Sequence, residues 1–122
     1  MTEKELHKII ERLLKLPKEC EWVEFKLNLK SEDEIGKYIS ALSNGACLQN
    51  ENFGYLVFGI NDISLLIEGT KFKPSLHKIG NEELENWLLQ RVSPRIEVQI
   101  FEVIYQEKKL AIFQVQIGRA HV

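Results

Sequence analysis

Two stretches of the 122-residue chain place charged side chains where they could act together. The first, residues 22–27, alternates with the period of a β-strand, so we expect Glu24 and Lys26 to share a face with Trp22 while the residues between them point into the core. The second is the turn at Asn61-Asp62, which lifts one carboxylate to the edge of an apolar strand. An ion pair on a solvated face would give the first pattern equally well. An ordinary β-turn explains the second, and for that stretch taken alone we prefer this interpretation.

Basic side chains gather in two further places. A predicted first helix carries four of them at steps of three and four residues: Lys4, Lys8, Arg12 and Lys15. A loop after the apolar strand carries Lys71 and Lys73, and Lys78 follows shortly after. Either set could lie along the phosphates of a nucleic acid. A solvated helix face would also produce the first pattern, and for that stripe we prefer this interpretation.

The element that must position these groups is the run from Phe53 to Asp62. Tyr55 to Ile60 is almost continuously apolar and β-favouring, which suits a strand covered on both faces and central in a sheet. It is too short to cross a membrane. Gly54 and Gly59 bracket the run, where a glycine often marks a bulge or a close backbone approach.

Two predicted helices precede this strand. The first begins with a capping box of Thr2 and Glu5 and stops at Pro17. The second begins with the capping-box pattern of residues 31–34 and contains Gly45. Glycine in a helix interior costs about 1 kcal/mol relative to alanine. Either this helix therefore crosses the sheet closely, or the neighbouring Asn44 faces a site.

The remaining elements complete an α+β domain. Residues 65–70 read as a strand that forms a hairpin with the apolar run, and residues 96–105 and 110–117 as a second hairpin. Between the hairpins, Asn81 caps a third helix with Glu82 and Glu83 in its first turn. This helix ends at Ser93-Pro94, and its predicted buried stripe is Leu84, Trp87, Leu88 and Val92. The predicted order is α-β-α-β-β-α-β-β, a mixed β-sheet with two hairpins and helices packed on it.

Composition limits the functional classes. With 44% hydrophobic and 28% charged residues, the chain is a single globular domain. Its net charge of −2 excludes a histone-like protein that coats nucleic acid non-specifically, so a nucleic-acid site must be a local patch.

Cys20 and Cys47 lack metal-ligand spacing, and no signal peptide precedes them, so we expect free thiols and a cytoplasmic protein. Residues 117–122 match the translation of a common sequencing adapter, so we expect a truncated domain over 1–117 and a non-native tail over 118–122.

Three motifs occur in an order that resembles the Schlafen AlbA-type domain. They are Glu19-x-x-x-x-Glu24-Phe25-Lys26, Ile39-Ser-Ala-Leu-Ser-Asn-Gly45 and Tyr55-Leu-Val-Phe-Gly-Ile-x-Asp62. The resemblance runs from about Leu16 to Ile117. It departs from the usual pattern at residues 46–52, where family members commonly carry two glycines, and there it is similar to a bacterial subgroup. The resemblance implies a DNA-binding domain of bacterial transcriptional regulators and helicase-related ATP-binding proteins, with further domains downstream. No phosphate-binding G-x-x-x-x-G-K-[ST] motif is present in this chain.

The family resemblance also implies a candidate catalytic site. Animal Schlafen proteins include ribonucleases that cleave transfer RNA with three carboxylates as a metal site, and the matching positions here are Glu19, Glu24 and Asp62. Such hard oxygen ligands would hold Mg²⁺ or Mn²⁺. Lys26 could then contact the phosphate.

Three functions follow as hypotheses. The first is a nucleic-acid-binding module, for DNA or RNA, at the amino-terminal part of a larger bacterial protein. The second is a metal-dependent endoribonuclease of Schlafen type. The third is a structural or regulatory domain without nucleic acid, which serves dimerisation or controls an attached ATPase; a second copy of the chain is then its partner. A salt-dependent shift assay separates the first from the third, and manganese-stimulated RNA cleavage separates the second from both.

Overall fold

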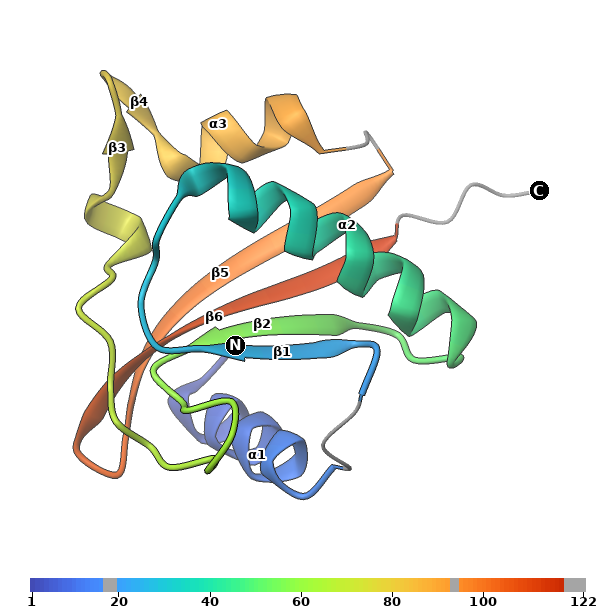
Figure 1. Cartoon of the computed structure of the whole chain (residues 1–122), viewed down its shortest axis with the longest axis vertical. Coiled ribbons are helices and arrows are strands. Elements are labelled where there is room, and N and C mark those ends of the chain that lie inside the picture. The colour runs from blue at the N-terminus through green and yellow to red at the C-terminus, as the bar shows by residue number, and fades with distance from the viewer. Residues whose placement is uncertain (17–19, 93–94, 118–122) are drawn as a thin grey trace.

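The computed structural model describes residues 1–16, 20–92 and 95–117 (Figure 1). Within these ranges the elements are α1 (Glu3–Leu14), β1 (Val23–Lys26), α2 (Glu32–Leu48), β2 (Gly54–Phe58), a 3₁₀-helix η1 (Pro74–Leu76), β3 (Lys78–Ile79), β4 (Glu82–Glu83), α3 (Leu84–Arg91), β5 (Ile96–Tyr105) and β6 (Lys108–Ile117). The predictions that concern Pro17, Glu19, the helix end at Ser93-Pro94 and the tail 118–122 lie outside the described residues.

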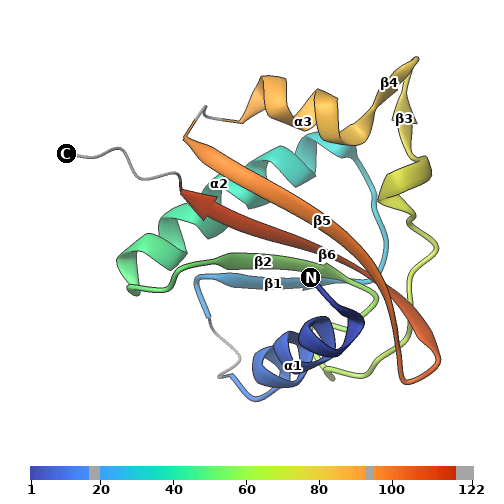
Figure 2. The same cartoon turned by 180° about the vertical axis from the view of Figure 1, so that it is seen from behind.

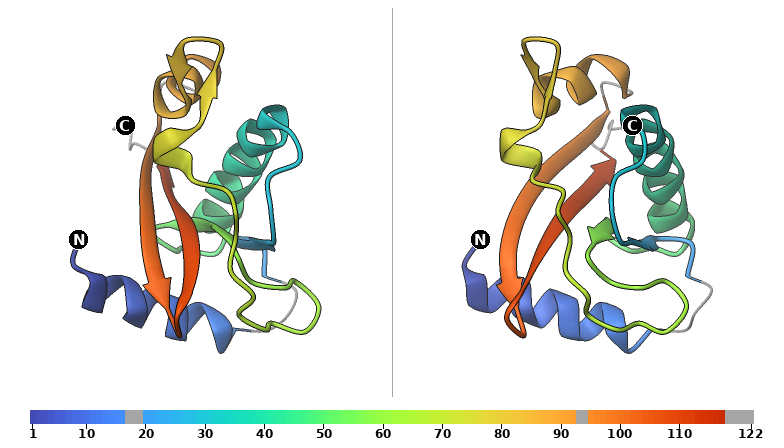
Figure 3. Two further views of the ribbon diagram at one scale, coloured as in Figure 1. Left: turned by 90° about the vertical axis from the view of Figure 1, so that its left-hand side faces the viewer. Right: turned by 60° about the vertical axis from the view of Figure 1, so that its left-hand side comes forward.

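Four strands form a mixed sheet in the order β1-β2-β6-β5. β1 and β2 are parallel, with Val23 opposite Tyr55 and Lys26 opposite Phe58. β6 runs antiparallel to both β2 and β5. Helices α2 and α3 lie on one face of the sheet and α1 on the other, as the views from behind and from the side show (Figures 2 and 3). The predicted α+β class with a mixed sheet is confirmed.

The apolar run lies where its composition predicts, between two hydrophobic layers. Every residue of β2 is buried. Leu56 and Phe58 pack toward α2 and α3, and Tyr55 and Val57 pack toward α1. None of the helices in the described part of the chain has both the length and the apolar character that crossing a bilayer requires.

The expected helix starts are confirmed for the first two helices. Thr2 caps α1 and forms the complete capping box with Glu5. Ser31 caps α2 by accepting a hydrogen bond from the backbone N–H of Asp33. The glycine at position 45 is explained by the close approach of α2 to the chain just before β1, because a Cβ at this position would overlap the backbone carbonyl of Glu21. Asn44 is exposed.

The first predicted hairpin is wrong. Residues 65–70 form no strand; they make one isolated bridge, Ile60 to Ile67, and fold back so that the N–H groups of Glu68 and Gly69 both donate to the carbonyl of Gly59. The physical reason is competition for the edges of β2. One edge is taken by β1 and the other by β6, so neither edge of β2 is left for residues 65–70.

The third helix begins later than predicted. Glu82 and Glu83 form β4, which pairs with Lys78–Ile79, and Glu83 rather than Asn81 is the N-cap residue of α3. Its predicted buried stripe is nevertheless confirmed: Leu84, Trp87, Leu88 and Val92 are all buried.

The second hairpin is also confirmed, with a tighter turn than expected. Gln106 and Glu107 adopt φ values of 51° and 65°, which closes the turn in two residues and starts β6 at Lys108.

Trp22 does not share the face of Glu24 and Lys26. The strand begins at Val23, so the alternation of side chains does not extend back to residue 22. Trp22 instead packs in the cluster on the α1 side, with its ring 6.4 Å from that of Tyr55.

Candidate functional site at the carboxyl ends of β1 and β2

The two parallel strands end side by side, and this places their following residues together. Lys26 is the last residue of β1 and lies opposite Phe58, the last residue of β2. The N–H of Gly59 donates to the carbonyl of Lys26 at 2.7 Å, which ties the turn after β2 to the end of β1. Asp62 stands exposed in the loop that follows. Its neighbour Asn61 holds that loop, accepting hydrogen bonds from the N–H groups of Ile63 and Ser64.

Lys26 is the cation of this site. Its Nζ lies 3.9 Å from Oε2 of Glu24 and 4.9 Å from the ring centroid of Tyr38, on α2. The hydrogen bond with Tyr38 raises the pKa of Lys26, and the charges of Tyr38, Glu24 and Asp62 raise it further, against the opposing effect of burial. Lys26 therefore keeps its positive charge throughout the physiological pH range.

Glu24 and Asp62 act on each other at this site. Burial raises the pKa of Glu24; the nearby Lys26 lowers it, and the charge of Asp62 raises it again. The same Asp62 contributes to the raised pKa of Lys26. Glu24 and Lys26 are therefore an ion pair, and Asp62 lies near enough for its charge to act on both.

The third carboxylate of the predicted set, Glu19, lies outside the described residues. Within the described ranges no group of three or more His, Cys, Asp or Glu side chains could hold a metal ion. The pair Glu24 and Asp62 still suits Mg²⁺ or Mn²⁺, because Mg²⁺ commonly binds through one or two carboxylates and completes its coordination with waters and substrate phosphates. The residues present therefore fit such an ion as a partial ligand set.

The predicted basic loop is anchored beside this site. Asn28, two residues beyond β1, accepts hydrogen bonds through Oδ1 from the Thr70 hydroxyl at 3.0 Å and from the Lys71 N–H at 2.9 Å. On its other side, the N–H of Thr70 donates to the carbonyl of Lys109 at 2.9 Å. Residues 69–71 therefore run between the end of β1 and the start of β6, past the tip of the β5–β6 hairpin (Figure 1).

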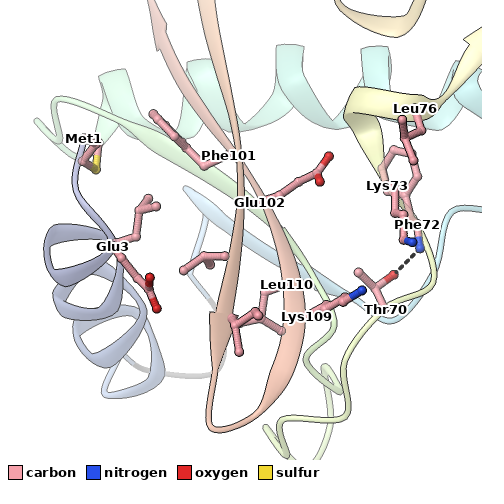
Figure 4. Close-up of a pocket in the computed structure, with 13 residues that line it drawn as sticks. Met1, Glu3, Thr70, Phe72, Lys73, Leu76, Phe101, Glu102, Lys109 and Leu110 are labelled. Atoms are coloured by element: carbon pink, nitrogen blue, oxygen red, sulfur yellow. Dashed lines mark hydrogen bonds between the residues drawn. The ribbon is translucent and has the colours of Figure 1, made fainter.

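This arrangement places two segments that each carry two lysines side by side. We call these four lysines the basic strip: Lys71, Lys73, Lys108 and Lys109. Lys109 projects toward Thr70, beside the segment that carries Lys73, and both lysines line one cavity of about 600 Å³ (Figure 4). All four are exposed, and in the part of the chain that the structure describes none of their ammonium groups lies within 4.0 Å of a carboxylate. The carboxylate of Glu102, in the same cavity, accepts the N–H of Ser75 at 2.8 Å.

Sequence reasoning missed Lys108 and Lys109. In the sequence these two lysines form part of the predicted hairpin connection. The segment that carries Lys71 lies beside them only because of the long-range hydrogen bond between Thr70 and Lys109. The only local signal is the pair of adjacent lysines beside the turn.

The other predicted basic residues lie elsewhere. Lys78 is on β3, opposite Glu83, and η1 separates it from Lys73. Lys4, Lys8 and Lys15 are exposed on α1 or directly after it.

Arg12 differs from the other members of its stripe because it is held in place. Its guanidinium group bonds Glu51 at 2.8 Å and lies 5.1 Å from the ring centroid of Trp22. The α1 stripe therefore has one member that serves packing.

The sequence model of the family described as Schlafen, AlbA_2 matches residues 19–122. The chain belongs to this family. The Schlafen AlbA_2 match includes all three motifs on which the resemblance rested and supports a nucleic-acid-binding domain in the broad sense. No curated protein matches the chain at a significant level.

Proposed function

We propose that this AlbA_2 domain binds DNA by its phosphates, through the basic strip, as the amino-terminal part of a larger bacterial cytoplasmic regulator or ATP-binding protein. The observation that carries the proposal is the basic strip itself. It carries four exposed lysines without carboxylate partners in the described chain, although the protein as a whole has a net charge of −2. Local cations of this kind bind phosphates and release counterions.

The fold supports this use because the two halves of the strip are fixed to each other. Thr70 links the loop to Lys109 on one side and to Asn28 on the other. Lysines held on a fixed framework lose less conformational freedom on binding than lysines on a free loop. Phosphate contacts fix orientation and carry no base sequence directly, so this surface accounts for affinity rather than sequence choice.

The test uses the lysines that only the structure places in the strip. Lys108→Gln with Lys109→Gln should weaken binding of a labelled DNA duplex about as much as Lys71→Gln with Lys73→Gln, by roughly tenfold in low salt for each pair. Fluorescence anisotropy measures the affinity. Full affinity in the Lys108/Lys109 variant would overturn the strip as the contact surface.

A second candidate function, metal-dependent cleavage of RNA, is favoured by the ion pair of Glu24 and Lys26 and by the nearby charge of Asp62. In this hypothesis Glu24, Asp62 and Glu19 hold Mg²⁺ or Mn²⁺, which when bound supplies an activated water and neutralises charge on the phosphate. Lys26, kept protonated by Tyr38, stabilises the negative charge that develops on the phosphate. Manganese-stimulated cleavage of transfer RNA that is lost in Asp62→Asn and strongly reduced in Lys26→Gln would support it. If the wild type does not cleave transfer RNA, this second function is excluded and DNA binding remains the proposed function.

A third candidate, a dimerising regulatory domain, rests on β5. This ten-residue strand lies at one edge of the sheet, along the rim of the molecule in the side view (Figure 3). The carbonyl of Ile104 on this strand bonds Nε2 of His7 at 2.7 Å, and the Ile104 side chain is 54% exposed. His7 therefore occupies the edge at Ile104, and the rest of this edge strand can pair with a second copy. Sedimentation should then show a dimer that Ile104→Lys dissociates without unfolding; a monomer at all concentrations would exclude this function for β5.

A further inference from the structure

A second cavity lies toward the other end of β2, where that strand begins. It has a volume of about 510 Å³ and is bounded by α1, by the residues that lead into β2 and by β6. Lys8 and Arg12 line it from α1, Phe53 and Tyr55 from β2 and the residue before it, and Gln114 from β6. Ligand cavities of small-molecule size span about 300 to 1,000 Å³, so the volume suits a compact group.

Gln114 is the unusual residue of this cavity. It lies directly opposite Tyr55 in the sheet and is only 8% exposed, on a face where its neighbours Leu110 and Ile112 belong to the core. Its amide bonds the hydroxyl of Tyr55 at 3.2 Å, and among the described residues it has no other side-chain partner. In this bond the amide uses one N–H of Nε2, which leaves Oε1 and the second N–H as the free end of the side chain.

The free end of that amide is open to the cavity. Ser43 Oγ is the one fully enclosed side-chain polar atom without a hydrogen-bond partner in the described part of the chain. The amide of Gln114 is not enclosed in this way, although its residue is nine-tenths buried. A buried amide with bonding capacity to spare, aimed into a cavity, points to a ligand that forms hydrogen bonds.

Gln114 alone supplies the side-chain amide of β5 and β6 that lines this cavity. Gln99 on β5 lies opposite Gln114 and is exposed, but neither Gln99 nor Gln116 is among the lining residues. Helix α1 covers the half of this face nearer the hairpin turn, where Val103 and Leu110 pack, and no helix in the described ranges covers the other half of β5 and β6 (Figure 2).

The walls combine an aromatic ring with balanced charges. Phe53 is only partly buried, and its ring lies 6.3 Å from that of Tyr55. Lys8 and Arg12 are matched by Glu5 and Glu51, which also line the cavity. A free anion would meet these carboxylates, and an apolar ligand would leave the amide of Gln114 unsatisfied. The chemistry therefore favours a neutral, flat group with hydrogen-bonding edges.

We propose that this cavity binds an unpaired nucleobase of single-stranded nucleic acid. The base stacks on Phe53 and presents its edge to the amide of Gln114, while Lys8 lies near a neighbouring phosphate. Because a glutamine amide matches the donor and acceptor pair of adenine, adenine is the preferred base. Bases held in a duplex cannot enter, so the site is selective for single strands. This inference rests on the proposed nucleic-acid function but uses a separate surface from the basic strip.

The experiment compares labelled oligo(dA), oligo(dT) and a duplex of equal length by fluorescence anisotropy. The wild type should prefer oligo(dA) over oligo(dT) by about tenfold, the discrimination that a bidentate amide contact provides. Gln114→Met keeps the length of the side chain without the amide and should reduce that ratio to about one. Phe53→Leu should weaken both single strands by about tenfold, through lost stacking, without changing duplex binding.

The basic-strip variant Lys71→Gln with Lys73→Gln is the matched control, since it should weaken duplex binding and leave the base preference intact. Thermal melting checks the fold of each variant, and Phe53→Leu provides the test should Gln114→Met fail to fold. A wild type that binds duplex without preferring oligo(dA), or a preference that survives Gln114→Met in a folded protein, overturns the inference and leaves the proposed function standing. Base preference without duplex binding upholds the inference and overturns the role of the basic strip.

Discussion

The two ends of the parallel pair β1–β2 present opposite chemistry. At the carboxyl ends, Glu24, Lys26 and Asp62 are partly or fully exposed charged groups beside the basic strip. Toward the amino ends, Tyr55 and Gln114 are buried neutral groups that line a cavity with balanced charges. Strand β2 contributes to both ends, and β6 supplies Gln114 opposite Tyr55. The first end suits phosphates and cations, whose binding weakens with salt, and the second suits a neutral base, whose binding should depend little on salt.

A substitution that disrupts β2, the strand that both ends share, should cause the largest loss of stability. Val57 lies in the middle of β2, fully buried and opposite Ile112. Val57→Asp places an unpaired charge there and should destabilise the domain by on the order of 4 kcal/mol or more, enough to unfold it. Urea unfolding followed by circular dichroism measures the loss. Glu24→Gln, a change of charge on the neighbouring strand, should stay folded; if it melts the domain as Val57→Asp does, the placement of Glu24 is wrong.

A divalent cation should act on the carboxyl ends alone. If Glu24 and Asp62 share Mn²⁺, the ion at about one hundred times its Kd should add roughly 2.7 kcal/mol of stability. Thermal melts with and without Mn²⁺ measure the effect, which Asp62→Asn should abolish and Gln114→Met should leave unchanged. An equal gain in wild type and Asp62→Asn would place the ion elsewhere.

How far the sequence predicts each end follows from the range of the contacts involved. Local patterns were sufficient for the capping box at Thr2, the buried stripe of α3 and the central burial of β2. They failed for residues 65–70, because the partners of β2 come from distant segments that a local pattern does not reveal. The family resemblance singled out Glu24 and Asp62, and the structure places Glu24 in β1 and Asp62 in the loop after β2. Lys109 and Gln114 escaped notice, since their neighbours Thr70 and Tyr55 are distant in the sequence.

Two glycines of α2 have different surroundings, so replacing each with alanine should change stability in opposite directions. Gly45 packs against the backbone of Glu21, before the start of β1, so Gly45→Ala should cost about 1–3 kcal/mol through overpacking at this end. A Cβ added at Gly36 would point into open space, and Gly36→Ala should add up to about 1 kcal/mol through helix propensity. Denaturant midpoints measure both. Stabilisation by both substitutions would show that α2 does not approach Glu21 closely.

The smallest expected effect is the pH dependence that Glu24 contributes. Its pKa is raised in the folded state above the ordinary value of 4.5, so the folded protein holds this proton more tightly than the unfolded chain. Stability should therefore fall as the pH rises from 4.5 through the raised pKa. Glu24→Gln removes this penalty, which we expect to be below about 1 kcal/mol because the side chain is partly exposed.

Urea unfolding of both proteins, below the ordinary pKa and at neutral pH, measures the contribution of Glu24. The stability of the variant relative to the wild type should be greater at neutral pH. The opposite trend would show that Lys26 outweighs burial in setting the pKa of Glu24.

The salt dependence of duplex affinity shows whether the basic strip contacts the phosphates of DNA. The slope of log K against log salt changes by about 0.9 for each phosphate contact. Lys71→Gln with Lys73→Gln should therefore flatten the slope by roughly two units. Lys4→Gln with Lys8→Gln, which removes the same charge from α1, should leave it unchanged. An unchanged slope in the strip variant, or equal flattening in both variants, would contradict the account.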